Sequence, residues 1–325
     1  MKIIADIDIP FLVEAVRLYW PGVCICPMKP EQIDSSVLAD ADVLVVRTRT
    51  KVDASLLEGT SIQMVCTATI GFDHIDTSYC ESHGIRWMSC PGSNAHAVCD
   101  YISEALCEVV SYQSALNNYL SPMTMGIVGV GHVGALVADM AERRGMRVLR
   151  NDPLKGIGVF LDESDGIEPF EGGNIEECDI ITFHTPLNKK TYHVCDARFL
   201  SRCRPGAFII NAARGGVVDE HALLHSGHPY ILDTWENEPH ITSEVLKHAF
   251  LASMHIAGYS LEGKRNASQM CLDAIAEHFL LSPIKLPQHL LSSGDNASGW
   301  LRRISEELKA APDSFEALRH NYPLR

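Results

Sequence analysis

An apolar run that leads into regularly spaced glycines constrains the fold more than any other feature of this chain. Residues 124–134 read Thr-Met-Gly-Ile-Val-Gly-Val-Gly-His-Val-Gly, and an apolar helix start follows. In this pattern Gly129 permits a tight turn, Gly131 lets a pyrophosphate approach the backbone, and Gly134 allows close packing of helix on strand. The pattern predicts a strand, a turn and a helix whose N-terminus faces the phosphates of a dinucleotide.

A second strand and an acid complete the context that such glycines need. Residues 147–152 read Arg-Val-Leu-Arg-Asn-Asp, and the closing Asp152 lies about twenty residues beyond the glycines, where a ribose diol would be held. His132 and Val133, which open the helix after the turn, join the predicted cofactor site. The order of strand, turn, helix, strand and acid predicts a site for NAD, whereas the glycines alone would fit an ordinary tight turn.

Three residues capable of acid and base chemistry follow downstream. Arg214 stands in Asn-Ala-Ala-Arg-Gly-Gly, Glu238 in Asp-Thr-Trp-Glu-Asn-Glu-Pro, and His255 in Met-His-Ile-Ala-Gly-Tyr. An arginine can bind a carboxylate and an adjacent oxygen through two parallel N–H bonds, and a histidine with a pKa of about 6.5 can accept and return one proton. A glutamate bonded to the second ring nitrogen fixes the histidine tautomer and favours its protonated form. The set suits oxidation of a 2-hydroxy acid.

Each of these residues also has a simpler interpretation. Arg214 could be a surface arginine after a strand, Glu238 a loop acid before a proline, and His255 a core histidine with satisfied hydrogen bonds. The basic run Arg-Thr-Arg-Thr-Lys at residues 47–51 could be a solvated face. The position of Arg214 at the end of a predicted strand in an α/β domain, where ligands gather, favours the functional interpretation.

The composition argues against several classes of function. Of the 325 residues, 46% are hydrophobic and 21% are charged, a composition typical of globular proteins. The net charge of −14 argues against nucleic acid and anionic membrane surfaces as partners. Eleven cysteines without CxxC pairs and 15 histidines without HExxH spacing argue against a metal site or a disulfide framework. Residues 1–8 place two acids where a signal peptide needs its apolar core, so we expect a cytoplasmic protein without a membrane span.

Alternating strand and helix patterns extend over most of the chain and predict parallel βαβ units. Residues 1–94 and 258–282 are expected to form a substrate-binding (lid) domain, interrupted by a cofactor domain of residues 95–257. Long helices near Asn94 and Gly258 would connect the two domains. We expect the active site in the cleft between them.

The C-terminal residues 283–325 differ in composition from the rest. Spacers rich in proline and serine lead to an amphipathic stretch at residues 299–309 and to a final one at residues 315–322. Both stretches are too short to bury a core of their own, so they must pack against another surface. We therefore expect a short dimerisation segment and a homodimer. The alternative is a tail that folds back on its own cofactor domain.

Four further motifs carry a resemblance to a known family: residues 46–52 (Val-Arg-Thr-Arg-Thr-Lys-Val), 67–74 (Thr-Ala-Thr-Ile-Gly-Phe-Asp-His), 91–95 (Pro-Gly-Ser-Asn-Ala) and 255–264 (His-Ile-Ala-Gly-Tyr-Ser-Leu-Glu-Gly-Lys). With the glycine turn and the Arg, Glu and His series, they make the chain resemble the D-isomer-specific 2-hydroxyacid dehydrogenases from Met1 to about Tyr322. The resemblance implies an α/β fold in which a Rossmann-like, doubly wound parallel sheet is inserted in a flavodoxin-like lid domain. It also implies NAD as the cofactor and a homodimer.

Carried over by position, the resemblance implies roles for individual residues. It makes Arg214 and Glu238 active-site residues and His255 the proton donor in the reducing direction. It also implies two groups of ligand contacts, with Asp152, Thr185, Asp233 and Gly258 at cofactor positions and Thr48, Thr69 and Tyr259 at substrate positions.

The substrate that the resemblance implies is 4-phospho-D-erythronate, oxidised by NAD in pyridoxal 5′-phosphate biosynthesis. We expect its phosphate to be bound by one or more of four cations, Arg47, Arg49, Lys51 and Lys264. Another 2-hydroxy acid, such as 3-phosphoglycerate or glyoxylate, is the alternative with the same chemistry. A protein that senses the nicotinamide cofactor without catalysis is a further alternative, against which the intact Arg, Glu and His argue.

Overall fold

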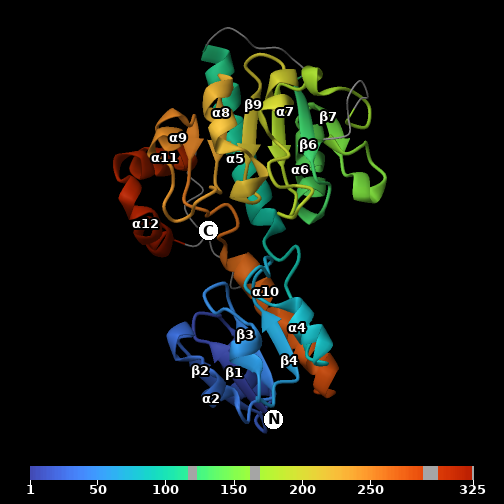
Figure 1. Ribbon diagram of the computed structural model, residues 1–325, viewed down its shortest axis with the longest axis vertical. Helices are drawn as coiled ribbons and strands as arrows, with labels where there is room; N and C mark the ends of the chain where they lie inside the picture. Colours follow the sequence, from blue (N-terminus) through green and yellow to red (C-terminus); the bar gives the residue numbers. More distant parts are fainter. Residues whose placement is uncertain (116–122, 162–168, 288–298, 324–325) are drawn as a thin grey trace. The chain divides into compact units, whose positions relative to one another are not determined.

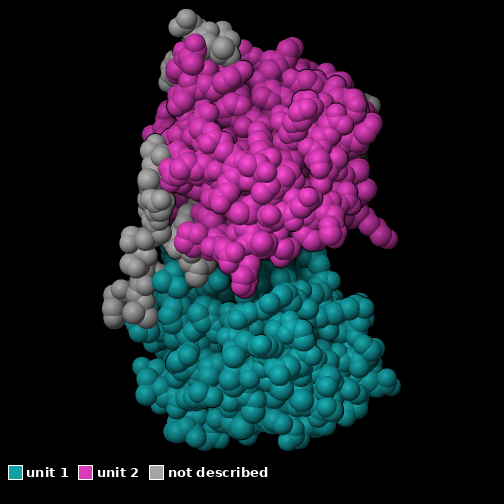
Figure 2. All heavy atoms as spheres, turned by 90° about the vertical axis from the view of Figure 1, so that its left-hand side faces the viewer, with its two compact units in different colours: residues 1–94, 259–293 teal, residues 95–258, 294–325 magenta. Residues whose placement is uncertain are grey.

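The computed structural model describes residues 1–115, 123–161, 169–287 and 299–323. It divides into two compact units, drawn in teal and magenta in Figure 2. The first unit contains residues 1–94 and 259–293, and the second contains residues 95–258 and 294–325. The predicted bounds place Gly258 with the lid domain and residues 283–325 in a segment of their own, whereas in this division Gly258 and the described residues 299–323 belong to the second unit.

The first unit is built on a parallel sheet of five strands in the order β2-β1-β3-β4-β5 (Figure 1). The strands are β1 (Lys2–Asp6), β2 (Cys24–Met28), β3 (Val43–Val46), β4 (Met64–Thr67) and β5 (Arg86–Met88). The helices are α1 (Leu12–Tyr19), α2 (Ser35–Leu38), α3 (Ala54–Leu57), α4 (Thr77–Ser82) and α10 (Leu261–Phe279). This strand order is that of flavodoxin-like folds, so the predicted architecture is confirmed.

Apolar residues cover both faces of this sheet, which is why its central strands are uninterrupted apolar runs. Successive residues of a strand point to opposite faces. Ile3 and Val43 pack with α1 and α10 on one face, and Ile4 and Leu44 pack with α2, α3 and α4 on the other. Because all five strands are parallel, the loops after their carboxyl ends gather at one edge of the sheet.

Strand β2 is an element that the sequence does not predict. Its residues are Cys-Ile-Cys-Pro-Met, and Pro27 has no N–H to donate to a sheet. Proline is confined to edge strands for this reason, and β2 lies at the edge of the sheet, paired with β1. A short run interrupted by proline therefore reads as a loop until its neighbour is known.

The second unit contains a parallel sheet of six strands in the order β11-β10-β9-β8-β6-β7. The strands are β6 (Thr124–Val128), β7 (Arg147–Asn151), β8 (Ile180–Phe183), β9 (Phe208–Asn211), β10 (Tyr230–Leu232) and β11 (Leu251–Ala252). The chain adds β7 on one side of β6 and β8 on the other, so the strand order reverses there. Ligands of open α/β sheets bind outside the carboxyl ends of the strands at such a reversal. The predicted Rossmann-like sheet is confirmed.

Helices flank this second sheet (Figure 1). They are α5 (Ala95–Ala115), α6 (His132–Arg143), α7 (Ala197–Arg202), α8 (Glu220–Ser226), α9 (Ser243–His248), α11 (Trp300–Ala310) and α12 (Phe315–Asn321). The long α5 packs beside α6 and α11. Over the described part of the chain, no helix combines the length and the hydropathy that a membrane span requires.

The C-terminal helix α11 packs on the second unit of its own chain. Trp300 meets Tyr101 of α5 edge to face, with ring centroids 5.9 Å apart, and Leu301 is fully buried. The Ser305 hydroxyl group accepts a hydrogen bond of 3.0 Å from the N–H of Ala252 in β11. The apolar face from which we expected a dimer contact is therefore covered within one chain, as in the alternative of a folded-back tail.

Candidate active site

The turn after β6 requires glycine at two of its three predicted positions. Gly129 has a φ of +90°, and a Cβ atom there would lie 2.7 Å from the carbonyl oxygen of His184. A Cβ atom at Gly134 would lie 1.9 Å from the carbonyl oxygen of Gly129, so only glycine allows α6 to pack on the turn. A Cβ atom at Gly131 would meet no neighbouring group of the described residues within 4 Å, so the backbone there is open to a phosphate.

Asp152 lies beside this turn. Its Oδ2 accepts a hydrogen bond of 3.0 Å from the Val130 N–H, and Lys155 Nζ donates to the Val130 carbonyl oxygen at 2.7 Å. Arg150 is paired with Glu142 at 2.7 Å. Across the described part of the chain, Oδ1 of Asp152 has no hydrogen-bond donor, so it can accept from a ribose hydroxyl group.

Two further observations fit a dinucleotide at this turn. Helix α6 begins at His132, and its N-cap Gly131 has no side chain to bond the first-turn N–H groups, which include that of Val133. The Thr185 hydroxyl oxygen is buried, its methyl group lies next to Gly129, and it has no hydrogen-bond partner among the described residues. A buried hydroxyl without a partner is uncommon in proteins, and a bound ligand would satisfy it. These residues therefore fit NAD.

Arg214 follows β9 in a loop that packs against the segment after β10. Asn211 Nδ2 donates to the Arg214 carbonyl oxygen at 2.8 Å. A Cβ atom at Gly215 would lie 1.9 Å from the Trp235 carbonyl oxygen, so glycine is required for this close contact. The guanidinium group is half-buried and donates from Nη1 to the carbonyl oxygen of Ala213 at 2.8 Å. The loop holds Arg214 at the carboxyl edge of the sheet.

Glu238 and His255 form a direct pair. Glu238 Oε2 lies 2.7 Å from His255 Nδ1, and Oε1 accepts a bond of 2.8 Å from the Trp235 N–H. Burial alone would raise the pKa of Glu238, but the His255 ring, the Trp235 N–H and the charge of Arg319 together hold this pKa below its usual 4.5. Glu238 is therefore ionised at neutral pH. With Nδ1 bound to Glu238, the other ring nitrogen, Nε2, is left for a substrate.

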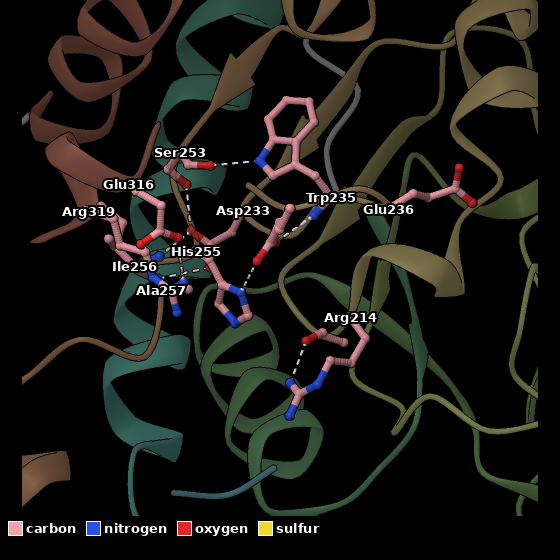
Figure 3. Close-up of polar contacts among 12 residues, drawn as sticks. Arg214, Asp233, Trp235, Glu236, Ser253, His255, Ile256, Ala257, Glu316 and Arg319 are labelled. Atoms are coloured by element: carbon pink, nitrogen blue, oxygen red, sulfur yellow. Dashed lines mark hydrogen bonds and ion pairs between the residues drawn. The ribbon is translucent and has the colours of Figure 1, made fainter. Parts of the chain in front are cut away.

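Asp233 holds the segment that carries His255 (Figure 3). Its carboxylate is 1% exposed and accepts three hydrogen bonds of 2.7–3.0 Å, from the Ser253 hydroxyl group and the N–H groups of Ile256 and Ala257. These bonds secure a φ of +58° at His255, a left-handed conformation that is costly for a residue other than glycine. Figure 3 shows the His255 ring and the Arg214 guanidinium group on the same side of the Trp235 segment.

An acid that the sequence does not single out lies next to these residues. Glu220, in the first turn of α8, is 3% exposed, and its Oε1 accepts a bond of 2.8 Å from the Glu236 N–H. Burial raises the pKa of Glu220 to about 7, and the negative charges of Glu236 and Glu238 add to this effect. Glu236 in turn pairs with His193. In a sequence, Glu220 looks like one of the acids that commonly stabilise the first turn of a helix.

The residues predicted to bind substrate belong to the first unit. Thr69 follows β4, and its hydroxyl oxygen lies 2.6 Å from that of Thr67. Thr48 follows β3 and is exposed, so both threonines lie at the carboxyl edge of the sheet. Tyr259 precedes α10, and Lys264 Nζ in the first turn of that helix lies 5.6 Å from the centre of the Tyr259 ring.

The predicted site residues thus fall into two groups. The cofactor and catalytic candidates lie in the second unit, and the substrate candidates lie in the first unit. The cofactor candidate Gly258 is half-buried and is the last residue of the stretch 95–258 of the second unit. Within the residues that the structure describes, there is no group of three or more His, Cys, Asp or Glu side chains that could hold a metal ion.

Comparison with known proteins gives concordant matches in sequence. The family model described as D-isomer specific 2-hydroxyacid dehydrogenase, NAD binding domain, matches residues 100–257. The erythronate-4-phosphate dehydrogenase of Bacteroides fragilis is 40% identical over 347 residues, which cover 100% of this chain and 97% of that protein. The protein of the same name from Coxiella burnetii is 37% identical over 354 residues, which cover 100% and 93%.

A solved structure shows the same fold. The NAD-bound 3-phosphoglycerate dehydrogenase of Entamoeba histolytica superposes with a TM-score of 0.67 at 24% identity, covering 90% of this chain and 99% of that one. At this level of identity the likeness concerns the arrangement of the chain and not the choice of substrate. The sequence matches are therefore the more informative of the two comparisons.

Proposed function

The chain belongs to the erythronate-4-phosphate dehydrogenases, NAD-dependent members of the D-isomer specific 2-hydroxyacid dehydrogenase family, and we propose that it oxidises 4-phospho-D-erythronate. The product is (R)-3-hydroxy-2-oxo-4-phosphooxybutanoate, and the step belongs to pyridoxal 5′-phosphate (vitamin B6) biosynthesis in the cytoplasm. The observation that carries the proposal is the match to relatives of this name along the entire chain.

The geometry of the second unit supports a role for each catalytic candidate. His255 Nε2 accepts the proton of the C2 hydroxyl group, while Nδ1 stays bound to Glu238. The ionised Glu238 stabilises the imidazolium that forms, and the Arg214 guanidinium group binds the substrate carboxylate and the oxygen on C2. In the reducing direction His255 returns the proton.

NAD, when bound, supplies the acceptor for the hydride from C2. The turn of Gly129, Gly131 and Gly134 would hold its phosphates, and Asp152 would accept from its ribose hydroxyl groups. The buried Thr185 hydroxyl group would gain the partner that it lacks among the described residues. Asp233 would act mainly through the His255 segment, since its oxygens already accept three bonds.

Two of the four cations proposed for the substrate phosphate are already engaged. Lys51 is paired with Asp53 at 2.7 Å and its side chain is 81% exposed. Arg49 is paired with Asp8 and its side chain is 48% exposed. Exposed pairs of this kind are screened by water, and neither cation lacks a counter-charge.

Arg47 and Lys264 are better placed to bind the phosphate. Both are half-buried, and across the described residues neither forms an ion pair. Burial and then the positive charge of Arg47 lower the pKa of Lys264 below its usual 10.5, with Asp8 opposing in part. A phosphate dianion would relieve this repulsion between two cations. We therefore assign the phosphate to Arg47 and Lys264, next to Tyr259.

A substrate panel tests the proposed function. Initial rates of NAD reduction are compared for 4-phospho-D-erythronate, D-erythronate and 3-phosphoglycerate, and NADH oxidation is measured with glyoxylate. We expect the highest kcat/KM for 4-phospho-D-erythronate. A higher value for 3-phosphoglycerate or glyoxylate would reassign the substrate, and turnover with none of the four would favour a protein that senses NAD without catalysis.

We propose further that the protein is a homodimer, as its family resemblance implies. Because the apolar face of α11 is buried in the second unit, we expect a partner to contact the outer faces of the C-terminal helices and not this apolar face. A chain cut near Ser282 would lose Trp300 and Leu301, which are part of the core of this unit. A change of oligomeric state after such a truncation would therefore not show that the removed segment forms the dimer contact. Light scattering on the intact chain of 35.8 kDa decides the question, since the mass of a single chain would refute the dimer.

A further inference from the structure

Glu220 is a buried acid for which the proposed chemistry has no direct use. It lies in α8, and its Oε1 accepts the Glu236 N–H at 2.8 Å, a bond that joins this helix to the segment after β10. Buried carboxyl groups are costly and rarely occur without a specific partner. The partner here is the backbone of a segment that carries active-site residues.

The Glu236 peptide lies between two of the proposed catalytic residues. On one side, a Cβ atom at Gly215, next to Arg214, would lie 2.5 Å from the Glu236 nitrogen, so the two backbones touch. On the other side, the Trp235 N–H bonds to the Glu238 carboxylate at 2.8 Å. A shift of the Glu236 backbone would therefore move Glu238 and press on the Arg214 loop.

We propose that Glu220 is a positioning residue whose carboxyl group anchors the Glu236 backbone and thereby keeps Glu238 on His255 and Arg214 in its loop. The inference rests on the roles that the proposed function gives to Arg214, Glu238 and His255. Glu220 acts through Glu236 and not on the substrate. A displacement of about 1 Å in such a site can lower turnover about a hundredfold, so one backbone bond can matter.

Charged groups around Glu220 decide which of its protonation states acts as the anchor. Glu236 and Glu238 face it from the segment after β10, Tyr230 lies on that strand, and Asp219 precedes it at the cap of α8, while His193 is bound by Glu236. Burial and the two glutamates keep Glu220 largely neutral below pH 7. A neutral carboxyl group still accepts the Glu236 N–H through its carbonyl oxygen, and a glutamine amide can do the same.

Two substitutions separate the anchor from the charge. Glu220→Gln keeps the acceptor, so kcat at pH 6.5 should stay within about threefold of the wild type. Glu220→Met keeps the length and removes the acceptor, so kcat should fall by about tenfold to a hundredfold while KM for NAD changes little. His221→Ala changes the next, exposed residue of α8 and serves as the matched control with wild-type kinetics.

Proton NMR gives a readout that does not depend on turnover. The His255 Nδ1 proton bonded to Glu238 should give a downfield signal, identified by its loss in His255→Gln. We expect the signal to persist in Glu220→Gln and to shift or broaden in Glu220→Met. If the methionine variant does not fold, Glu220→Asp replaces it, because a side chain one methylene shorter withdraws the acceptor from Glu236.

The two readouts also distinguish this inference from the proposed function. If 4-phospho-D-erythronate is not turned over, the NMR signal still reports whether Glu220 positions Glu238. A methionine or aspartate variant with the wild-type signal and the wild-type kcat would overturn the inference. Loss of the signal together with loss of kcat, both restored in Glu220→Gln, would support it.

Discussion

The Glu220→Gln substitution is expected to change how the stability of the second unit depends on pH. Burial raises the pKa of Glu220 to about 7 in the folded protein, against 4.5 for an ordinary glutamate. The difference of about 2.5 corresponds to about 3 kcal/mol, at about 1.4 kcal/mol for each tenfold change in proton affinity. Because Glu220 is 3% exposed, water screens little of this effect.

The sign follows from which state holds the proton. Below pH 4.5 the carboxyl group is protonated in both the folded and the unfolded chain, so it contributes no pH dependence. Between pH 4.5 and about 7 only the folded chain keeps the proton, so the free energy of unfolding falls as pH rises. At pH 7 the folded carboxyl group is about half ionised, and above about pH 8 the loss is complete and the contribution is constant. Glutamine has no proton to bind, so it removes this fall.

The free energy of unfolding is measured by urea titration at pH 5, 6, 7 and 8, with tryptophan fluorescence as the probe. The background carries Trp20→Phe and Trp87→Phe, which leaves only the two tryptophans of the second unit. The variant should gain about 2.5 kcal/mol relative to the wild type between pH 5 and pH 8, because part of the full difference lies below pH 5. Glu244→Gln, an exposed acid on α9, is the matched control. If the curves for Glu220→Gln and the wild type run parallel from pH 5 to pH 8, the assigned pKa is wrong.

Four further predictions concern the active site and its ligands. His255→Ala should keep NAD binding, measured by fluorescence, but lose turnover by about 10²-fold to 10⁴-fold. Near-wild-type turnover would show that His255 is not the acid/base. Arg214→Lys should also lose turnover, because a point charge cannot replace a bidentate fork. Asp152 should make the wild type prefer NAD to NADP, and equal kcat/KM for the two cofactors would contradict its assignment. Lys264→Met should raise KM and lower kcat for the phosphorylated substrate. Lys51→Met, which changes an exposed lysine, should alter neither constant. Equal effects of the two substitutions would be evidence against the assignment of the phosphate to Lys264.

The cofactor turn could be predicted because its requirements are local. A φ of +90° at Gly129 and the contact between Gly129 and Gly134 depend on residues within one turn of the chain, and the sequence pattern records them directly. The central strands of both sheets could be predicted for a similar reason, since a strand buried on both faces is an uninterrupted apolar run. The edge strand β2 has no such run, and its pairing with β1 depends on residues more than twenty positions away.

The parts of the site that the sequence does not reveal are bonds between distant segments. Asp233 could be placed near the cofactor by resemblance, but its bonds to the His255 segment join residues 20 to 24 positions apart in the chain. Glu220 and Glu236 are each ordinary acids in a sequence, and only their 2.8 Å contact marks one of them as an anchor. Burial and hydrogen-bond partners of this kind follow from the complete fold and not from spacing.

The C-terminal helices show how an amphipathic pattern can be read correctly and still mislead about its partner. The pattern at Trp300 and Leu301 predicts an apolar face, but an apolar face on the same chain or on a second chain would cover it equally well. Here the chain's own second unit covers this face, and α12 brings Arg319 close to Glu238. Burial raises the pKa of Glu238, and the charge of Arg319 helps to lower it, after the larger lowering effects of the His255 ring and the Trp235 N–H. The tail therefore adds to the field that keeps Glu238 ionised, so its loss would change the active site as well as any contact between chains.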